Sequence, residues 1–198
     1  MATSASSTST KRQSGKEVGF TLLELVVVIG IIVILTSMVA GYSREGGRQL
    51  ALVSTETKML NLLNRAKFLS IETFFGGGRK GDERICAYGV KVDTANEEMF
   101  IFQDLSTEAS CPGNSNGVYD EGEQLAGELN EIKLQSTSVA FSGETNLSEV
   151  IFIPPDPQTK IKKSDTSEVS EAKLFVKLRE GDGRFIISVN NAGQIKAE

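Results

Sequence analysis

The longest apolar run in the chain lies close to its N-terminus. Residues 20–40 are apolar or small and weakly polar, and Glu24 is the only charged residue among them. A helix rises about 1.5 Å per residue, so a run of this length is enough to cross the ~30 Å hydrocarbon core of a membrane. The pattern therefore predicts a membrane-spanning helix that carries one carboxylate near its start.

The helical pattern continues beyond this run, but it becomes amphipathic. Residues at a spacing of three or four positions form the predicted packing stripe, which consists of Leu50, Val53, Thr57, Leu60, Leu63, Lys67 and Ile71, with Leu52, Met59 and Phe68 close by. We expect this stripe to lie on a folded domain. Glycine is unfavourable inside helices, so the glycine-rich segment 41–47 predicts a bend or local melting, and the glycines at 76–78 predict the helix end.

After the glycines at 76–78 the pattern changes to short strands separated by turn residues. The predicted strands are residues 85–92, 98–102, 131–135, 138–141, 150–153, 172–178, 184–189 and 194–196. Prolines at 154–157 predict a break followed by a polar loop that runs to about residue 170. The fold class that follows is α+β, with a long N-terminal helix packed on a mostly antiparallel β-sheet or sandwich.

The residues at the start of the apolar run match a known processing signal. The sequence Gly-Phe-Thr-Leu-Leu-Glu at residues 19–24, followed by the apolar run, resembles the class III signal of type IV pilins and pseudopilins. This resemblance implies cleavage between Gly19 and Phe20 by a prepilin peptidase and N-methylation of Phe20. It also implies that Glu24 neutralises the terminal amine of a neighbouring subunit, because an unpaired carboxylate is costly in lipid. The alternative for Glu24 is a side chain that reaches toward the lipid headgroups.

The same resemblance implies the function, partners and location of the chain. It predicts a structural, non-enzymatic subunit of a type IV pilus or of a type II secretion pseudopilus. The implied partners are other pilin or pseudopilin subunits, the prepilin peptidase, the inner-membrane assembly platform and membrane lipid. The implied location is the cytoplasmic membrane before assembly and a periplasmic or extracellular filament afterwards. A membrane-tethered domain unrelated to filaments is the alternative if the signal is fortuitous.

Charge and length are consistent with one exported domain. Three basic residues precede the apolar run, so the positive-inside tendency predicts a cytoplasmic N-terminus and an outward-facing C-terminal domain. The predicted organisation is a leader at 1–19, a transmembrane and assembly helix at 20–75 and a globular β-rich domain at 76–198. A secretory signal peptide cleaved after the small residues at 36–40 is an alternative.

Cys86 and Cys111 are the only cysteines in the chain. In an exported domain two cysteines fit one disulfide, which would close a loop of about 25 residues and add around 3 kcal/mol to stability. Two free thiols are the alternative, and they would suit a cytosolic chain better.

An acidic loop in the middle of the domain is a candidate calcium site. Oxygen-bearing residues and one backbone carbonyl fall at spacings that resemble part of an EF-hand loop. The candidate ligands are Asp104, Asn114, Asn116, Val118, Asp120 and Glu123. Pro112 stands where the first aspartate of such a loop would be, so a solvated acidic loop remains the alternative to a structural calcium ion.

The residues give less support to catalysis, zinc binding or DNA binding. The chain has no histidine, which removes the usual catalytic triads and the commonest zinc ligand.

Residues 100–104, 117–123 and 191–195 are similar to the GspH/FimT type of minor pseudopilin and minor pilin. Some minor pilins of the FimT type bind DNA, so a tip subunit that binds DNA or surfaces is the alternative function. The candidate DNA contacts are Lys173, Lys177, Arg179, Arg184 and Lys196. The net charge of −5 and the lack of interleaved aromatic residues argue against nucleic acid as a partner.

Overall fold

The structure is a computed structural model that describes residues 19, 21–108, 110–111, 113, 115–135, 137–154, 158–164 and 167–198. Most of the predicted leader, the predicted methylation site Phe20 and the candidate calcium ligand Asn114 lie outside the described residues. The chain divides between Ser43 and Arg44 into two compact units. The first holds the apolar run, and the second holds the rest of the helix and all of the described strands.

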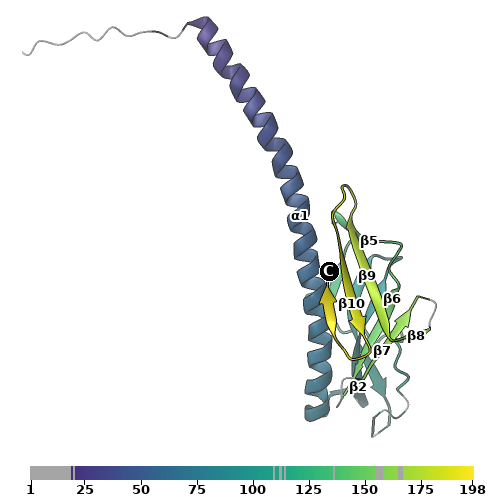
Figure 1. Cartoon of the computed structure of the whole chain (residues 1–198). Coiled ribbons are helices and arrows are strands. Elements are labelled where there is room, and N and C mark those ends of the chain that lie inside the picture. Colours follow the sequence, from purple (N-terminus) through teal and green to yellow (C-terminus); the bar gives the residue numbers. More distant parts are fainter. Residues whose placement is uncertain are drawn as a thin grey trace, which may run out of the picture. The chain divides into compact units, whose positions relative to one another are not determined.

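One helix, α1 (Leu22–Gly76), contains both predicted helical halves (Figure 1). Its first part is long and apolar enough to cross a membrane, which agrees with the sequence pattern. The hydroxyl of Ser37 donates to the carbonyl oxygen of Val33 at 2.7 Å, so this polar side chain is satisfied inside the helix itself. A hydroxyl bonded in this way can lie in lipid without an unpaired donor.

The predicted local melting at residues 41–47 is wrong, because α1 is continuous through this segment. Glycine costs about 1 kcal/mol in a helix interior, and long helical segments on both sides are enough to propagate the helix across it. The predicted helix end is confirmed. Gly77 has φ 65°, a left-handed value that favours glycine, and its amide donates to the carbonyl oxygen of Thr73 at 2.9 Å.

The second half of α1 packs on the sheets with a stripe that agrees only in part with the predicted one: Leu63 and the neighbouring Leu52 and Met59 are buried. The stripe that is buried consists of Leu52, Thr55, Met59, Leu62, Leu63, Ala66 and Ser70. Of the predicted stripe only Leu63 is buried, whereas Leu50, Val53 and Ile71 are exposed. The buried stripe also contains the small residues Ala66 and Ser70, and the hydroxyl of Ser70 donates to the carbonyl oxygen of Phe152. Leu60 is partly buried against the core, so the sheets cover one stripe of the helix fully and leave a second, interrupted stripe largely exposed.

The strands form two sheets in which every recorded pairing is antiparallel, so the predicted α+β fold is confirmed. The seven-stranded sheet has the order β4-β3-β2-β6-β7-β8, with β1 paired to β2. Its strands are β1 (Arg79–Lys80), β2 (Glu83–Asp93), β3 (Glu98–Ser106), β4 (Glu131–Lys133), β6 (Leu147–Ile153), β7 (Gln158–Lys163) and β8 (Glu168–Val169). The four-stranded sheet has the order β11-β10-β9-β5. Its strands are β5 (Val139–Phe141), β9 (Glu171–Leu178), β10 (Arg184–Asn190) and β11 (Ile195–Ala197), and a short 3-10 helix, η1 (Glu128–Asn130), precedes β4.

Strands β7 and β8 contradict the predicted polar loop that ran to about residue 170. In β7 the side chains of Thr159 and Ile161 are buried while Lys160 is exposed, which is the alternation of a half-buried strand. The strand pairs with β6 over six residue pairs. The lysine-rich composition of this segment is typical of a polar loop, so the sequence did not predict a strand. Its inward-facing positions are nevertheless apolar or hydrogen-bonded. The two-residue strand β1 was also missed, since it follows the glycines directly.

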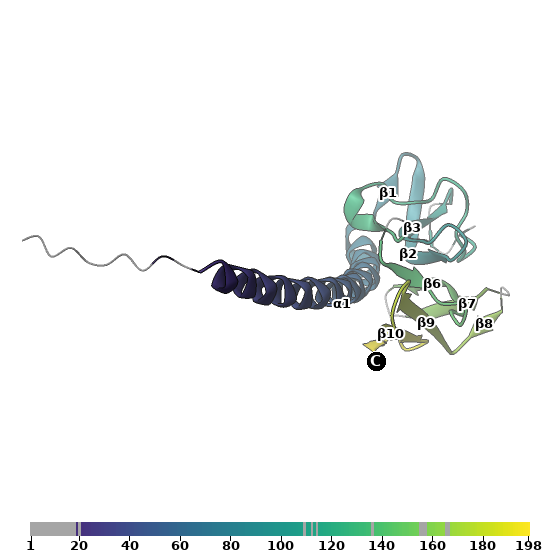
Figure 2. The same ribbon diagram turned by 90° about the horizontal axis from the view of Figure 1, so that it is seen from above.

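The main core lies between the second half of α1 and the two sheets. It combines Met59 and Leu63 of the helix with residues such as Val90 and Ile101 of the larger sheet and Leu174 of the smaller one. Figure 2 shows β2 and β3 apart from β9 and β10, with the helix beside both groups. The same helix also makes a polar contact with the turn between β10 and β11. There Lys67 donates a hydrogen bond to the carbonyl oxygen of Gly193 at 2.9 Å.

A second, smaller apolar cluster lies on the other face of the seven-stranded sheet. It contains Ala87, Phe102 and Ile151, and Tyr119 from the long loop after β3 packs against it. The ring of Tyr119 meets those of Phe100 and Phe102 edge to face, with centroids 5.1 and 5.6 Å apart. The loop is therefore held over the outer face of this sheet by apolar contacts as well as by hydrogen bonds.

Candidate functional site

The candidate processing and assembly residues lie at the start of α1 or just before it. Gly19 is exposed and precedes the helix, and Phe20 lies outside the described residues. The hydroxyl oxygen of Thr21 accepts a hydrogen bond from the amide of Glu24 at 3.2 Å, which makes Thr21 the N-cap of the helix. Glu24 is therefore in the first helical turn, where the helix dipole favours a negative charge.

The apolar part of α1 has no cover within its own unit. Its large apolar side chains from Leu22 to Val39 are all between 43% and 81% exposed. In water such a surface would be strongly unfavourable, because each fully buried large apolar side chain is worth about 1.5 to 3 kcal/mol. An exposed apolar helix of this length near the N-terminus is typical of a membrane span or of a signal sequence.

The predicted disulfide is confirmed, since Cys86 and Cys111 are bonded. Cys86 lies in β2 at an irregularity in the pairing with β3, between Ile85 and Ala87. Cys111 belongs to the long loop after β3. The disulfide therefore fixes one point of that loop to the sheet, close to the acidic segment.

The acidic segment is organised by carboxylates that accept hydrogen bonds from backbone amides. Asp104 Oδ2 accepts from the amide of Gly117 at 3.1 Å. One oxygen of Glu123 accepts from Leu105 at 3.1 Å, and the other accepts from Asp120 at 2.8 Å. These bonds tie the loop to β3 and shape its turn.

The remaining candidate calcium ligands take part in the same loop. The Nδ2 group of Asn116 donates to the carboxylate of Asp120 at 2.7 Å, and its Oδ1 accepts from the amide of Val118 at 2.9 Å. The side-chain oxygens of Asn116 and Glu123, and one carboxylate oxygen each of Asp104 and Asp120, thus accept hydrogen bonds inside the chain. Within the described residues no group of three histidine, cysteine, aspartate or glutamate side chains is placed to hold a metal ion. Calcium at this loop stays a prediction.

Asp104 has the most perturbed environment of these residues. Only 3% of it is exposed, and its Oδ1 is buried without a hydrogen-bond partner in the part of the chain that the structure describes. Burial, followed by the nearby negative charge of Glu123, raises the pKa of Asp104 to about 6. Burial likewise raises the pKa of Glu123. Ionising Asp104 therefore costs free energy in the folded domain.

Four of the five candidate DNA contacts share one face of the four-stranded sheet. Lys173 and Lys177 alternate with buried residues along β9, so they point away from the core. Lys177 is directly opposite Arg184, and Ser188 is opposite both Lys173 and Lys196. The register therefore brings these four cations to the outer face of the sheet, where Lys177 is beside Arg184 and Ser188 separates Lys173 from Lys196.

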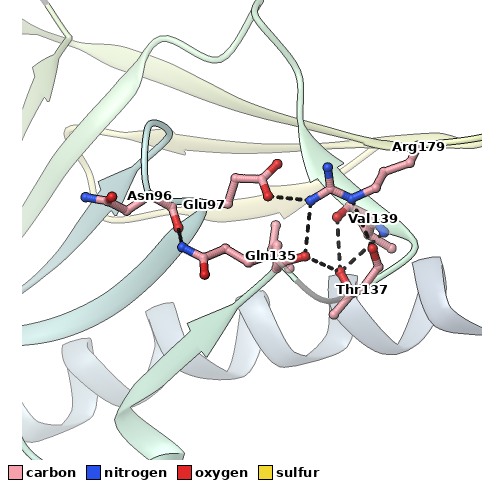
Figure 3. A network of polar contacts seen from close by, with 7 residues as sticks. Asn96, Glu97, Gln135, Thr137, Val139 and Arg179 are labelled. Atoms are coloured by element: carbon pink, nitrogen blue, oxygen red, sulfur yellow. Dashed lines mark hydrogen bonds and ion pairs between the residues drawn. The ribbon is translucent and has the colours of Figure 1, made fainter.

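Arg179 has a different environment from the other four. It forms an ion pair with Glu97 at the β2–β3 turn, and it donates to the carbonyl oxygens of Thr137 at 3.0 Å and Leu134 at 3.3 Å (Figure 3). Glu97 has φ 51°, the only left-handed value among the described non-glycine residues. Arg179 thus links the end of β9 to a turn of the other sheet. Glu97 and Arg179 are 82 residues apart in the sequence, so no local sequence pattern predicts this contact.

No known protein family, curated protein or solved structure matches this chain. The family resemblance accordingly depends on the residues at 19–24 and on the architecture. A long helix with an apolar first part, packed by its second part on antiparallel sheets, is consistent with a pilin-like architecture.

Proposed function

We propose that this chain is a structural subunit of a pilus or of a secretion pseudopilus, cleaved after Gly19 and assembled through α1. The observation that carries the proposal is the register of Gly19, Phe20 and Glu24 at the start of the apolar run, whose side chains are exposed along α1. The proposed location is the cytoplasmic membrane, with the C-terminal domain outside. Lipid surrounds the apolar helix before assembly, and helices of neighbouring subunits replace lipid in the filament.

The position of Glu24 supports an assembly role. Its carboxylate belongs to the first helical turn, and cleavage after Gly19 would create a terminal amine four residues before it. A carboxylate inside lipid costs a few kcal/mol, and a cationic amine from a neighbouring subunit offsets that cost. Subunits would therefore associate most favourably in the one register that pairs these charges.

The uncovered stripe on the second half of α1 supplies a further surface for neighbours. Its large apolar members are exposed and consist of Leu50, Val53, Phe68, Ile71 and Phe75. They lie on the same helix as the apolar span, and the sheets of the same chain do not cover them. Packing against other subunits would remove this surface from water.

Mass spectrometry of the membrane-extracted protein tests the processing step. In cells with an active prepilin peptidase we expect the chain to begin at methylated Phe20, and in a peptidase-deficient strain we expect the intact leader. Gly19→Leu is the matched variant, which should retain the leader in both strains. An intact leader on the wild-type chain in the active strain would refute the proposed processing.

Two variants of one residue test the assembly step. Glu24→Ala and Glu24→Gln should both insert into the membrane as the wild type does, because removing a charge does not oppose insertion. Both should enter filaments poorly, since neither can pair with a terminal amine. Filament incorporation is measured by immunoblotting of sheared filaments against the membrane pool. Wild-type incorporation of both variants would remove the charge-pairing argument.

A second candidate function is DNA binding by a minor tip subunit. The observation that favours it is the shared outer face of Lys173, Lys177, Arg184 and Lys196. Retention of the protein on DNA should then weaken with rising salt and be lost when Lys173 and Lys177 are replaced by alanine. Arg179→Ala is the comparison, because Arg179 is bound to Glu97 rather than free on that face. Retention that does not depend on these lysines would exclude this candidate.

A further inference from the structure

One asparagine of the acidic loop, Asn116, is followed directly by a glycine, and no other asparagine in the sequence is. In such a pair the backbone nitrogen of the glycine can attack the carboxamide carbon of the asparagine, because glycine has no Cβ to obstruct the approach. Asn116 is exposed, and Gly117 has φ 69°, a left-handed value that favours glycine. Neither proposed function uses this pair.

The carboxamide of Asn116 is folded back along the chain. Its Oδ1 accepts a hydrogen bond from the amide of Val118, two residues further on, at 2.9 Å. This bond holds the carboxamide beside the peptide group that joins Asn116 to Gly117. It also polarises the carbonyl of the carboxamide. A backbone amide in this position stabilises the negative charge that develops on the oxygen when a nucleophile adds to the carbon.

A carboxylate lies within reach of the attacking nitrogen. The amide of Gly117 donates to Asp104 Oδ2 at 3.1 Å. A general base has to lie within about 2.6 to 3.2 Å of the atom whose proton it takes, and Asp104 meets this condition. Because the carboxylate takes a proton as the nitrogen attacks, the net charge of the loop does not change during that step.

A third contact fixes the leaving group. The Nδ2 group of Asn116 donates to the carboxylate of Asp120 at 2.7 Å. Exchanging the two ends of the carboxamide would turn Nδ2 toward the Val118 amide, which is also a donor, and Oδ1 toward a carboxylate. The two bonds therefore hold the carboxamide in one orientation, with its oxygen toward the stabilising amide.

Water has access to the same segment. Asn116 and Gly117 line a cavity of about 650 Å³ on the outer face of the seven-stranded sheet, to which β2, β3, β6 and β7 also contribute. The disulfide belongs to the same wall. A space of this size holds water molecules beside the pair, and water is the only co-reactant that conversion of an asparagine to an acid consumes.

We propose that Asn116 converts without an enzyme to aspartate and isoaspartate through a cyclic imide formed with Gly117. A bond forms between the nitrogen of Gly117 and Cγ of Asn116, and the bond from Cγ to Nδ2 breaks. The proton of Gly117 leaves with that nitrogen as ammonia. Water then adds to either carbonyl of the imide and opens it to the acid.

The modification changes the charge of the loop. It replaces the Nδ2 donor by a carboxylate oxygen, so a hydrogen bond to Asp120 becomes a repulsion between two like charges. The modified loop should therefore be held less firmly than the unmodified one. The inference depends on neither proposed function, because every group in the reaction belongs to the folded domain.

Peptide mass spectrometry of the full-length protein, aged in detergent micelles at neutral pH, tests this inference. Asn116 should be converted about tenfold faster in the folded protein than in the same protein unfolded in guanidinium with its disulfide intact. Asp104→Asn should slow the folded-state reaction at least about tenfold. The asparagine can accept the hydrogen bond of Gly117, but it cannot take the proton.

The unfolded-state rates separate the chemistry from the fold. In guanidinium the wild type and the Asp104 variant should react equally fast, because the contact with residue 104 is lost. Asn191, which is exposed and precedes an alanine, should react more slowly than Asn116 in the same folded sample. A folded-state rate at or below the unfolded-state rate would overturn the inference. So would an unchanged rate in an Asp104→Asn variant that keeps the wild-type circular dichroism spectrum.

Discussion

Replacing Asp104 by asparagine should change how the stability of the domain depends on pH. The substitution keeps the shape of the side chain and an oxygen that can accept from Gly117, and it removes the charge. The asparagine still has one polar atom at the position of the orphan oxygen, so the number of unpaired atoms stays the same. The main change is therefore electrostatic.

The magnitude follows from the pKa of Asp104, which rises from the ordinary value of 3.8 to about 6 in the folded protein. Each pKa unit corresponds to about 1.4 kcal/mol, so the shift of about 2 units corresponds to about 3 kcal/mol. Between these two pKa values the folded state binds more protons than the unfolded state. The free energy of unfolding of the wild type should therefore decrease as pH rises from about 4 to about 6, and the penalty should be complete above that range.

Urea unfolding of the full-length protein in detergent, followed by tyrosine fluorescence, measures this effect at a series of pH values. At about pH 8 the asparagine variant should be more stable than the wild type by up to about 3 kcal/mol, and at about pH 4 this advantage should disappear. The chain has no tryptophan, so the signal comes from the tyrosines, of which Tyr88 and Tyr119 belong to the folded domain.

Asp93→Asn provides a control of opposite sign. Hydrogen bonds from the amides of Asn96 and Ala95 lower the pKa of Asp93, so its ionised form stabilises the fold above about pH 4 and this contribution is lost on acidification. The Asp93 variant should therefore lose stability at neutral pH. An unchanged pH dependence in the Asp104 variant, or the same sign of change in both variants, would refute the reasoning.

Three further predictions concern contacts within the domain. Arg179→Ala should lower the free energy of unfolding by about 1 to 2 kcal/mol, because an ion pair and two carbonyl contacts are lost; no change in urea unfolding would contradict this. Reduction of the Cys86–Cys111 disulfide should cost about 3 kcal/mol and speed hydrogen exchange in the acidic loop, and equal exchange in both redox states would exclude that role. Gly89→Ala should cost at least about 1 to 3 kcal/mol, because its Cβ would lie 2.4 Å from the Phe102 ring; wild-type thermal stability would show that the ring can move away.

Features that depend on local sequence were predictable. The apolar run and the glycines at 76–78 determine where α1 is apolar and where it ends, since both depend on neighbouring residues. The hairpin of β2 and β3 was predictable for the same reason, because Asp93 to Asn96 form a turn that their own side chains stabilise. The disulfide needed only the count of cysteines and the predicted compartment.

Which face of a helix or strand is buried was not predictable in the same way, because it depends on the rest of the fold. The second half of α1 has two apolar stripes, and periodicity alone does not show which one the sheets will cover. The buried stripe includes Met59 and Leu63, which belong to the main core, and Ser70, whose hydroxyl donates to the carbonyl oxygen of Phe152. In β7 the lysines dominate the composition, although Thr159 and Ile161 alone determine which face is buried.

The candidate sites show the same division. Gly19 and Glu24 became candidates from sequence alone because the stretch that resembles a processing signal is continuous, and their roles stay predictions. The surroundings of Asp104 could not be, since the cavity wall combines β2, β3, β7 and a loop that lie far apart in the chain. Likewise, nothing local to Arg179 indicates its contact with Glu97.

The uncovered stripe of α1 also has a practical consequence for handling the protein. A fragment that starts after the apolar span would still present Phe68 and Phe75, which are 64% and 82% exposed, to water. Exposed aromatic side chains of this kind promote self-association. Deleting the span would therefore give a fragment that aggregates or binds detergent at high concentration. Its measured size in solution would report on this stripe rather than on the sheets.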